Sequence, residues 1–329
     1  ASLSGVTFIS IPGVVGAGGT NKAFAYMQMV LGYVIGYMVI ANVLLPLYYR
    51  LNLVSIYGYL EQRFGYYSYK TGAGYFLLSR VIGASFRLFL VAIVLQKFIM
   101  EPLGVPFVAT VAVTIGLIWV YTFKGGIKTI VWTDTLQTIC MLVAVVLTIG
   151  AIGSEMNLSI AGMWNEIENA GLNQLVFLEG GWEDPNNFFK QVISGALITI
   201  TMTGLDQDMM QKNLTCRNLG DAQKNMFTFS IILVVANFLF LSLGALLYIY
   251  AAHLGLGIPE RTDQLFPLIA LEHLSPVIGI VFILGLTAAA YSSADSALTS
   301  LTTAFCIDFL NLEKRKGVEP EKKLVRLRW

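Results

Sequence analysis

VIGIVFILGLTAAAYSSADSALTSLTTAFCIDF, residues 277–309, is an apolar run with the polar sequence Tyr291 to Ser296 in its middle. The run is long enough to cross a bilayer, which takes about 20 residues of helix. An aspartate at mid-bilayer costs about 2.5–3.5 kcal/mol, so Asp295 needs a compensating group. On a helix, Asp295 lies beside Ser292, on a face rich in oxygen atoms that suit a small hard cation. The residues that share this face are Ala289, Ser292, Ser293, Ser296 and Ser300.

Composition indicates a polytopic membrane protein. The chain has 329 residues, of which 56% are hydrophobic and 12% charged, and its mean hydropathy is +0.70. A net charge of +1 gives no sign of a nucleic-acid partner. The three cysteines lack metal-ligand spacing, so we expect neither disulfides nor zinc. The lipid bilayer is therefore the expected surroundings of the chain.

Hydropathy predicts one transmembrane domain over residues 1–329, with residues 310–329 as a cytoplasmic loop. Lysine and arginine fall mainly in alternate loops, fifteen in one set and four in the other, and the richer set should face the cytoplasm. We expect the chain to be a fragment, because it begins without methionine inside an apolar run. The predicted membrane segments are a partial one at 1–15 and full ones at 23–49, 71–96, 105–123, 129–152, 188–210, 226–252 and 276–309.

Small, hydroxylated and helix-breaking residues fill the start of the chain, from Ala1 to Gly19. This composition favours a broken helix, whose freed carbonyl groups need an ion or a cavity. Close packing between helices is an equally good explanation, since glycine and serine let transmembrane helices approach. Both interpretations stay open on the residues alone.

Asp134, Arg80 and Arg87 stand out among the other charged residues within predicted spans. Asp134 follows Trp132 one turn into its span, and it is either an interfacial aspartate or a partner of the site around Asp295. Arg80 and Arg87 are two turns apart in one apolar span, so both cannot reach the same membrane surface. We expect at least one arginine to face a polar interior, where it pairs with an aspartate or binds an anionic substrate group.

Four motifs, in this order along the chain, resemble the sodium:solute symporter family, which includes sodium/glucose cotransporters and bacterial proline, galactose and sialic acid carriers. The resemblance implies an all-α polytopic membrane protein with an inverted-repeat (LeuT-like) symporter fold of five plus five helices and a broken first core helix. The chain should stop after the eighth core helix and lack the last ones, which leaves the second repeat incomplete. The motifs are Ser4 to Ile9, Gly125 to Gln137, Gly204 to Lys212 and Ala288 to Ser296.

The same resemblance implies one or two bound sodium ions and no organic cofactor. The general sodium site of the family maps onto the carbonyl groups of Leu3 and Ala289 and the hydroxyl groups of Ser292 and Ser293. A second site, present in some members, maps onto Asp134, Ser292, Asp295 and Ser296. Residue 295 departs from the serine expected there, so its carboxylate either strengthens cation binding or couples transport to protons.

Substrate contacts are predicted at Ser4, Thr7, Gln28, Arg80 and Arg87. Ser4 and Thr7 match polar substrate-binding positions of the family, and Gln28 lies near the facing positions on the second helix. The two arginines flank the third-helix position at which related carriers bind their substrate. Thr7 replaces the glutamine of the sugar carriers, so their pattern is not reproduced, and the two flanking arginines favour an anionic substrate.

We therefore expect a sodium-coupled importer of a small polar solute, such as a sugar acid, an organic acid or a sugar, working by alternating access in a bacterial inner (plasma) membrane. The alternative is a transporter-like sensor that binds the solute without moving it. A channel is disfavoured because polar residues cluster at mid-membrane in few spans. We expect no enzyme, since the only histidines, His253 and His273, lie in predicted outward loops. The oligomeric state is left open.

Overall fold

The computed structural model describes residues 5–53, 55–122 and 127–310, and every regular element in these ranges is a helix. This confirms the all-α class. In chain order the helices are α1 (Gly5–Val14), α2 (Tyr26–Val39), α3 (Leu45–Arg50), α4 (Gly58–Phe64), α5 (Tyr66–Leu95), α6 (Phe107–Thr122), α7 (Ile127–Glu155), α8 (Ile160–Asn169), α9 (Phe188–Thr199), α10 (Gln207–Leu214), α11 (Leu219–His253), α12 (Leu265–Leu268) and α13 (Pro276–Ala304). Wider π turns continue five of them, at Ile40–Leu44, Gln96–Met100, Ile200–Gly204, Ile269–His273 and Phe305–Phe309.

Within the part of the chain that the structure describes, four helical stretches are long and apolar enough to cross a membrane, and the bent pair of α9 and α10 makes a fifth if it counts as one span. Length and composition alone define these stretches, so the eight membrane segments and the cytoplasmic loop stay predictions. The four stretches are Tyr26–Arg50, Tyr66–Met100, Asp134–Glu155 and Leu219–His253.

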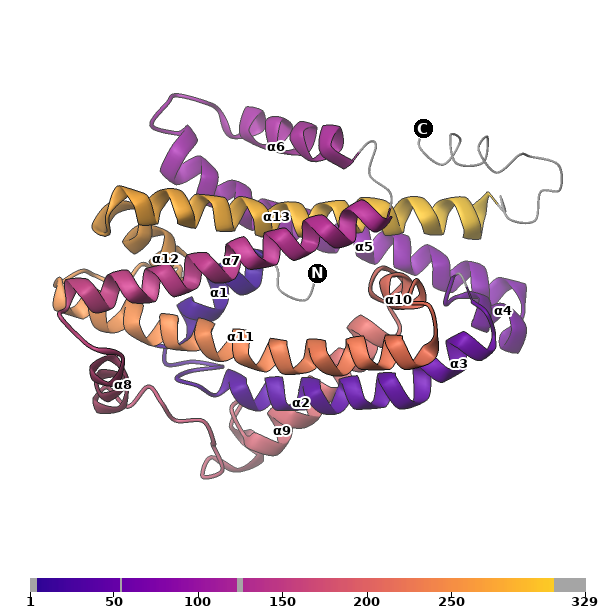
Figure 1. The fold of residues 1–329 in the computed structure, drawn as a ribbon, viewed down its shortest axis with the longest axis horizontal. Helices are drawn as coiled ribbons and strands as arrows, with labels where there is room; N and C mark the ends of the chain where they lie inside the picture. The colour runs from indigo at the N-terminus through magenta and orange to yellow at the C-terminus, as the bar shows by residue number, and fades with distance from the viewer. Residues whose placement is uncertain (1–4, 54, 123–126, 311–329) are drawn as a thin grey trace.

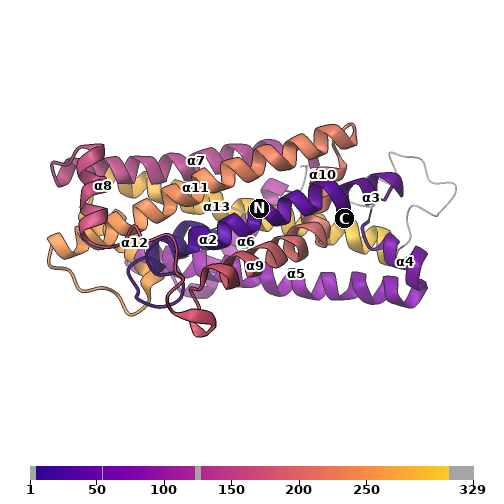
Figure 2. The same ribbon diagram turned by 90° about the horizontal axis from the view of Figure 1, so that it is seen from below.

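The long helices form two groups that run roughly parallel (Figures 1 and 2). In one group α13 packs on α7 and on α5, and in the other α2 packs on α9 and on α11. Helix α1 lies between the groups and contacts α5, α11 and α13. A cavity enclosed by this arrangement draws its walls from both groups.

Glycines allow α2 and α9 to approach unusually closely. A Cβ atom added at Gly32 would collide with the carbonyl oxygen of Val192, and one added at Gly195 would collide with that of Met29. Small residues at such crossings let helix backbones pack in van der Waals contact, which is a main source of helix association in lipid. The two helices therefore pack backbone against backbone at this crossing.

Aromatic rings fix α1 against its neighbours. Phe8 is fully buried, and its ring centroid lies 5.5 Å from that of Phe282 on α13 and 5.1 Å from that of Phe266 on α12. Phe240 of α11 meets the same ring edge-on at 6.3 Å. These contacts anchor α1, which carries the predicted substrate residue Thr7, to both helix groups.

The chain breaks sharply between α9 and α10, which meet at an angle of 67°. The break leaves backbone groups without helical partners, and each costs several kcal/mol in hydrocarbon unless it is satisfied. Tyr48 donates a hydrogen bond to the carbonyl oxygen of Gly204 at 2.9 Å, and the Asp206 side chain accepts one from the N–H of Met209 at 3.2 Å. The aspartate thereby caps α10 and is held at the edge of the cavity.

Candidate functional site

A cavity of about 650 Å³ lies between the two helix groups. This size and its mixed lining are typical of a small-molecule site, which usually combines apolar walls with a few placed polar groups. Helices α1, α2, α5, α9 and α11, with the break before α10, contribute the walls. The polar lining residues are Thr7, Tyr26, Tyr33, Tyr37, Tyr57, Tyr75, Ser79, Arg80, Arg87, Thr199, Thr201, Thr203, Asp206 and Asn237.

Arg80 is paired with two carboxylates at the α9–α10 break. Its Nη1 atom lies 3.7 Å from Oδ2 of Asp206, and its Nη2 atom contacts Oδ2 of Asp208. The Arg80 side chain is only 10% exposed and that of Asp208 3%. Charges this buried persist when they are paired, so Arg80 holds α10 against α5 and its own charge is neutralised.

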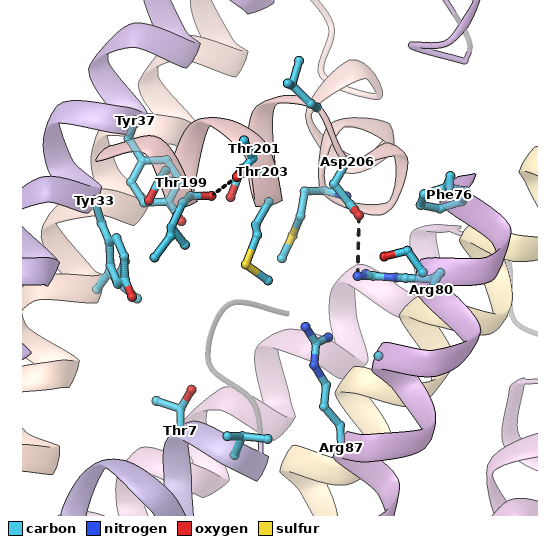
Figure 3. A pocket seen from close by; sticks show the side chains of 18 of the residues that line it. Thr7, Tyr33, Tyr37, Phe76, Arg80, Arg87, Thr199, Thr201, Thr203 and Asp206 are labelled. Atoms are coloured by element: carbon cyan, nitrogen blue, oxygen red, sulfur yellow. Dashed lines mark hydrogen bonds and ion pairs between the residues drawn. The ribbon is translucent and has the colours of Figure 1, made fainter. Parts of the chain in front are cut away.

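Arg87 differs from Arg80 although both lie on α5. Among the carboxylates whose side chains the structure describes, which do not include Asp295, none lies within ion-pair distance of its guanidinium. The side chain is half-buried and reaches into the cavity, while Arg80 is turned toward Asp206 (Figure 3). A guanidinium presents a planar fork of donors that matches a carboxylate bidentately. Arg87 is therefore the cavity's cation available for an anionic ligand.

Hydroxyl groups line other parts of the same cavity. The hydroxyl groups of Tyr26 and Tyr33 lie 3.0 Å apart on α2, and Thr7 of α1 faces them across the cavity (Figure 3). The Oγ1 atom of Thr201 donates to the carbonyl oxygen of Leu197 at 2.9 Å, which leaves its lone pairs as acceptors. The cavity thus joins one cationic end to a hydroxyl-rich wall, which suits a polyhydroxylated or small polar acid.

Only some of the predicted substrate residues line the cavity. Thr7, Arg80 and Arg87 all line the cavity, whereas Ser4 lies outside the described residues. Gln28 is not among the lining residues that the structure describes, and it is almost fully buried. Its amide donates to the carbonyl oxygens of Ala25 and Asn186 and accepts from the N–H of Phe177. These bonds hold the loop before α9 against α2.

The general sodium site is only partly described. Leu3 and the side chains of Ser292 and Ser293 lie outside what the structure describes. Ala289 is buried on α13, the helix that Phe8 of α1 contacts through Phe282. The structure thus brings α1 close to α13, which carries Ala289, and the ligand set itself stays a prediction.

Two predicted ligands of the second cation site meet around a lysine. The Nζ atom of Lys212 on α10 lies 2.5 Å from Oδ2 of Asp134 on α7 and 2.7 Å from Oγ of Ser296 on α13. The side chains of Ser292 and Asp295 lie outside the described part. Nothing in the sequence pattern assigned Lys212 to this place.

Asp206, Asp208 and Lys212 were not predicted as site residues. They belong to the motif Gly204 to Lys212, whose density of charge beside an apolar span was the available signal. Intramembrane charges are functional by default and call for a named partner. Asp206, Asp208 and Lys212 could have been predicted by looking in this motif for oppositely charged partners of Arg80 and Asp134.

Residues 1–329 match the family model of the sodium:solute symporter family. The chain belongs to the sodium:solute symporter family. Its symporter fold is confirmed by a solved structure of a Na+-coupled sialic acid symporter in a substrate-bound outward-open state, which superposes with a TM-score of 0.84 at 22% identity and covers 99% of this chain and 68% of that one.

Curated relatives are similar to this chain at about the same level of sequence identity. The sodium/sialic acid symporter NanT of Aliivibrio fischeri is 24% identical over 98% of this chain, and SiaT of Proteus mirabilis is 22% identical over 98%. The human sodium/iodide cotransporter is 25% identical over 97%. The chain spans 62%, 64% and 50% of these relatives, respectively.

Proposed function

We propose that the whole protein is a sodium-coupled secondary transporter that imports a small anionic solute by alternating access. Its solute is a carboxylate bound by Arg87, with the rest of the molecule facing the tyrosine and threonine hydroxyl groups of the cavity. Family membership and the fold support the sodium coupling. The observation that carries the anionic substrate is Arg87, a cavity cation with no carboxylate partner in the described chain.

The fold suggests how one ion can drive the cycle. Sodium is bound as a co-substrate between α1 and α13, by the carbonyl groups of Leu3 and Ala289 and the hydroxyl groups of Ser292 and Ser293. A ligand that contacts both helices shifts the equilibrium toward the state in which they are close, here the outward-open state that accepts solute. Each positive charge that moves inward gains about 2.3 kcal/mol per 100 mV.

The decisive experiment is uptake by the full-length protein reconstituted in liposomes. An inward Na+ gradient should accumulate a labelled acid, tested as N-acetylneuraminate, gluconate and lactate, and replacing Na+ with choline should abolish the accumulation. Sodium-dependent binding without accumulation would make the protein a sensor instead. Accumulation of glucose with none of the acids would overturn the anionic substrate.

The sodium ligands are tested separately with Ser293→Ala. We expect this variant to need a higher Na+ concentration for half-maximal solute binding, because it loses one oxygen ligand. Ser300→Ala on the same helix is the matched control, since the Ser300 hydroxyl bonds to the carbonyl oxygen of Ala297 at 3.1 Å. Unchanged sodium dependence of Ser293→Ala would refute the ligand set. In this proposal the protein is a multi-pass membrane protein, and its placement in a bacterial inner membrane stays a prediction.

A further inference from the structure

Lys212 occupies the place where the family resemblance puts a second sodium ion. Its ammonium group lies 2.5 Å from the Asp134 carboxylate and 2.7 Å from the Ser296 hydroxyl, and both residues are predicted ligands of that ion. The Lys212 side chain is 22% exposed and the Asp134 side chain 16%, so water screens the pair little. The ion pair between Lys212 and Asp134 therefore belongs to the protein interior and not to its surface.

The lysine is held in place from both ends of its helix. Asp206 caps the start of α10 and pairs with Arg80 on α5. Thr215 bonds to the carbonyl oxygen of Lys212 at 2.7 Å just after the end of α10. The backbone that carries the ammonium group is thus fixed relative to α5, and its side chain reaches α7 and α13 on the other side.

An ammonium group and a sodium ion exclude each other at this position. Both carry one positive charge and both are satisfied by carboxylate and hydroxyl oxygens. The Oδ2 atom of Asp134 already accepts from Lys212, and a second cation within a few ångströms would be repelled by the ammonium charge. The residues present therefore fit a tethered cation better than a free one.

We propose that Lys212 is a built-in cation that replaces the second sodium ion, so that the protein binds one sodium ion fewer than its oxygen ligands would otherwise hold. The tether makes this charge part of the protein, and it is not released on the inner side of the membrane. For its effect on transport the inference rests on the proposed function. With one sodium ion and one monoanionic solute, each import cycle moves no net charge.

The test counts sodium ions bound by the full-length protein in detergent, by equilibrium binding of radiolabelled Na+ without solute. Lys212→Gln should bind about one more ion per molecule than the wild type. Lys224→Gln is the matched control, because Lys224 is exposed on α11, and it should bind the wild-type number. The double variant Asp134→Asn/Lys212→Gln should return to the wild-type number, since the carboxylate ligand is lost. Equal counts for the wild type and Lys212→Gln would overturn the proposal.

Chemical rescue decides the case if Lys212→Gln does not fold. Lys212→Cys treated with 2-aminoethyl methanethiosulfonate regains an ammonium group, whereas methyl methanethiosulfonate leaves the position neutral, and wild type treated in the same way controls for the native cysteines. The ammonium adduct should bind the wild-type number of ions and the neutral adduct about one more. Equal counts for the two adducts would overturn the proposal.

These counts separate the inference from the proposed function. A wild type that binds no sodium would refute sodium coupling, and a gain of one ion in Lys212→Gln would still support the role of the lysine. In liposomes that transport the acid, an imposed membrane potential should leave wild-type uptake unchanged and should stimulate uptake by Lys212→Gln.

Discussion

Replacing Arg87 with glutamine should weaken binding of an acidic solute sharply. The guanidinium lies in the cavity and forms no ion pair with a described carboxylate, and the nearby Asp206 keeps its ion pair with Arg80 when Arg87 is replaced. The loss is then the charged hydrogen bonding to the ligand alone. Hydrogen bonds to charged groups contribute about 1.5–3 kcal/mol each. With about 1.4 kcal/mol per tenfold change, the dissociation constant should rise about 10- to 140-fold.

The assay is equilibrium binding of the transported acid to purified full-length protein at saturating Na+. Each protein is measured with the acid and with its neutral carboxamide, so that the difference isolates the contact between Arg87 and the carboxylate. Arg87→Gln should lose affinity for the acid and little for the amide. Arg87→Lys should fall between, since it keeps the charge and loses the planar fork.

Two outcomes would refute this reasoning. If Arg87→Gln bound the acid with wild-type affinity, the guanidinium would not contact the ligand. If acid and amide lost affinity equally, Arg87 would shape the cavity without recognising charge. Either result would remove the support that this residue gives to an anionic substrate.

Three further predictions concern stability and reactivity. Arg80→Met leaves the Asp206 and Asp208 carboxylates without their ion pairs and should destabilise the protein by about 3–5 kcal/mol, while the double variant with Asp208→Leu should recover part of this in thermal unfolding. Gly195→Ala should cost about 1–3 kcal/mol because its Cβ collides with the facing helix, whereas Gly74→Ala, with no atom within 4 Å, should stay within about 0.5 kcal/mol of wild type. Burial raises the pKa of the Cys216 thiol in the turn after α10, and this lowers the thiolate fraction at neutral pH. Maleimide should therefore label Cys216 more slowly than it labels glutathione at pH 7.5. The labelling rate of Cys216 should still rise between pH 8 and 9.

The fold class was predictable because it depends on local properties. Long apolar runs give helices, and the four motifs gave the family, so the symporter fold is confirmed. The kink between α9 and α10 was missed: residues 188–210 read as one apolar span. The break depends on Tyr48, a residue distant in sequence that satisfies the freed carbonyl group of Gly204.

The sequence identified single charged residues of the site but not the partners with which they pair. Two arginines in an apolar span imply a polar interior, and both line the cavity. Which arginine is neutralised depends on Asp206 and Asp208, which lie far along the chain. Likewise Lys212 is 78 residues from Asp134, so neither pair has a local periodicity to reveal it. Charge pairing across helices is set by packing, which hydropathy does not encode.

The ion pair between Lys212 and Asp134 has an energetic consequence for the cell. If the tethered ammonium leaves one sodium ion per monoanion, only the sodium concentration ratio drives accumulation. A tenfold ratio is worth about 1.4 kcal/mol and permits at most about tenfold enrichment of the solute. A second free ion would square that ratio and add about 2.3 kcal/mol per 100 mV. Under the two proposals, Lys212 would limit the maximum enrichment of the solute and would make uptake independent of the membrane voltage.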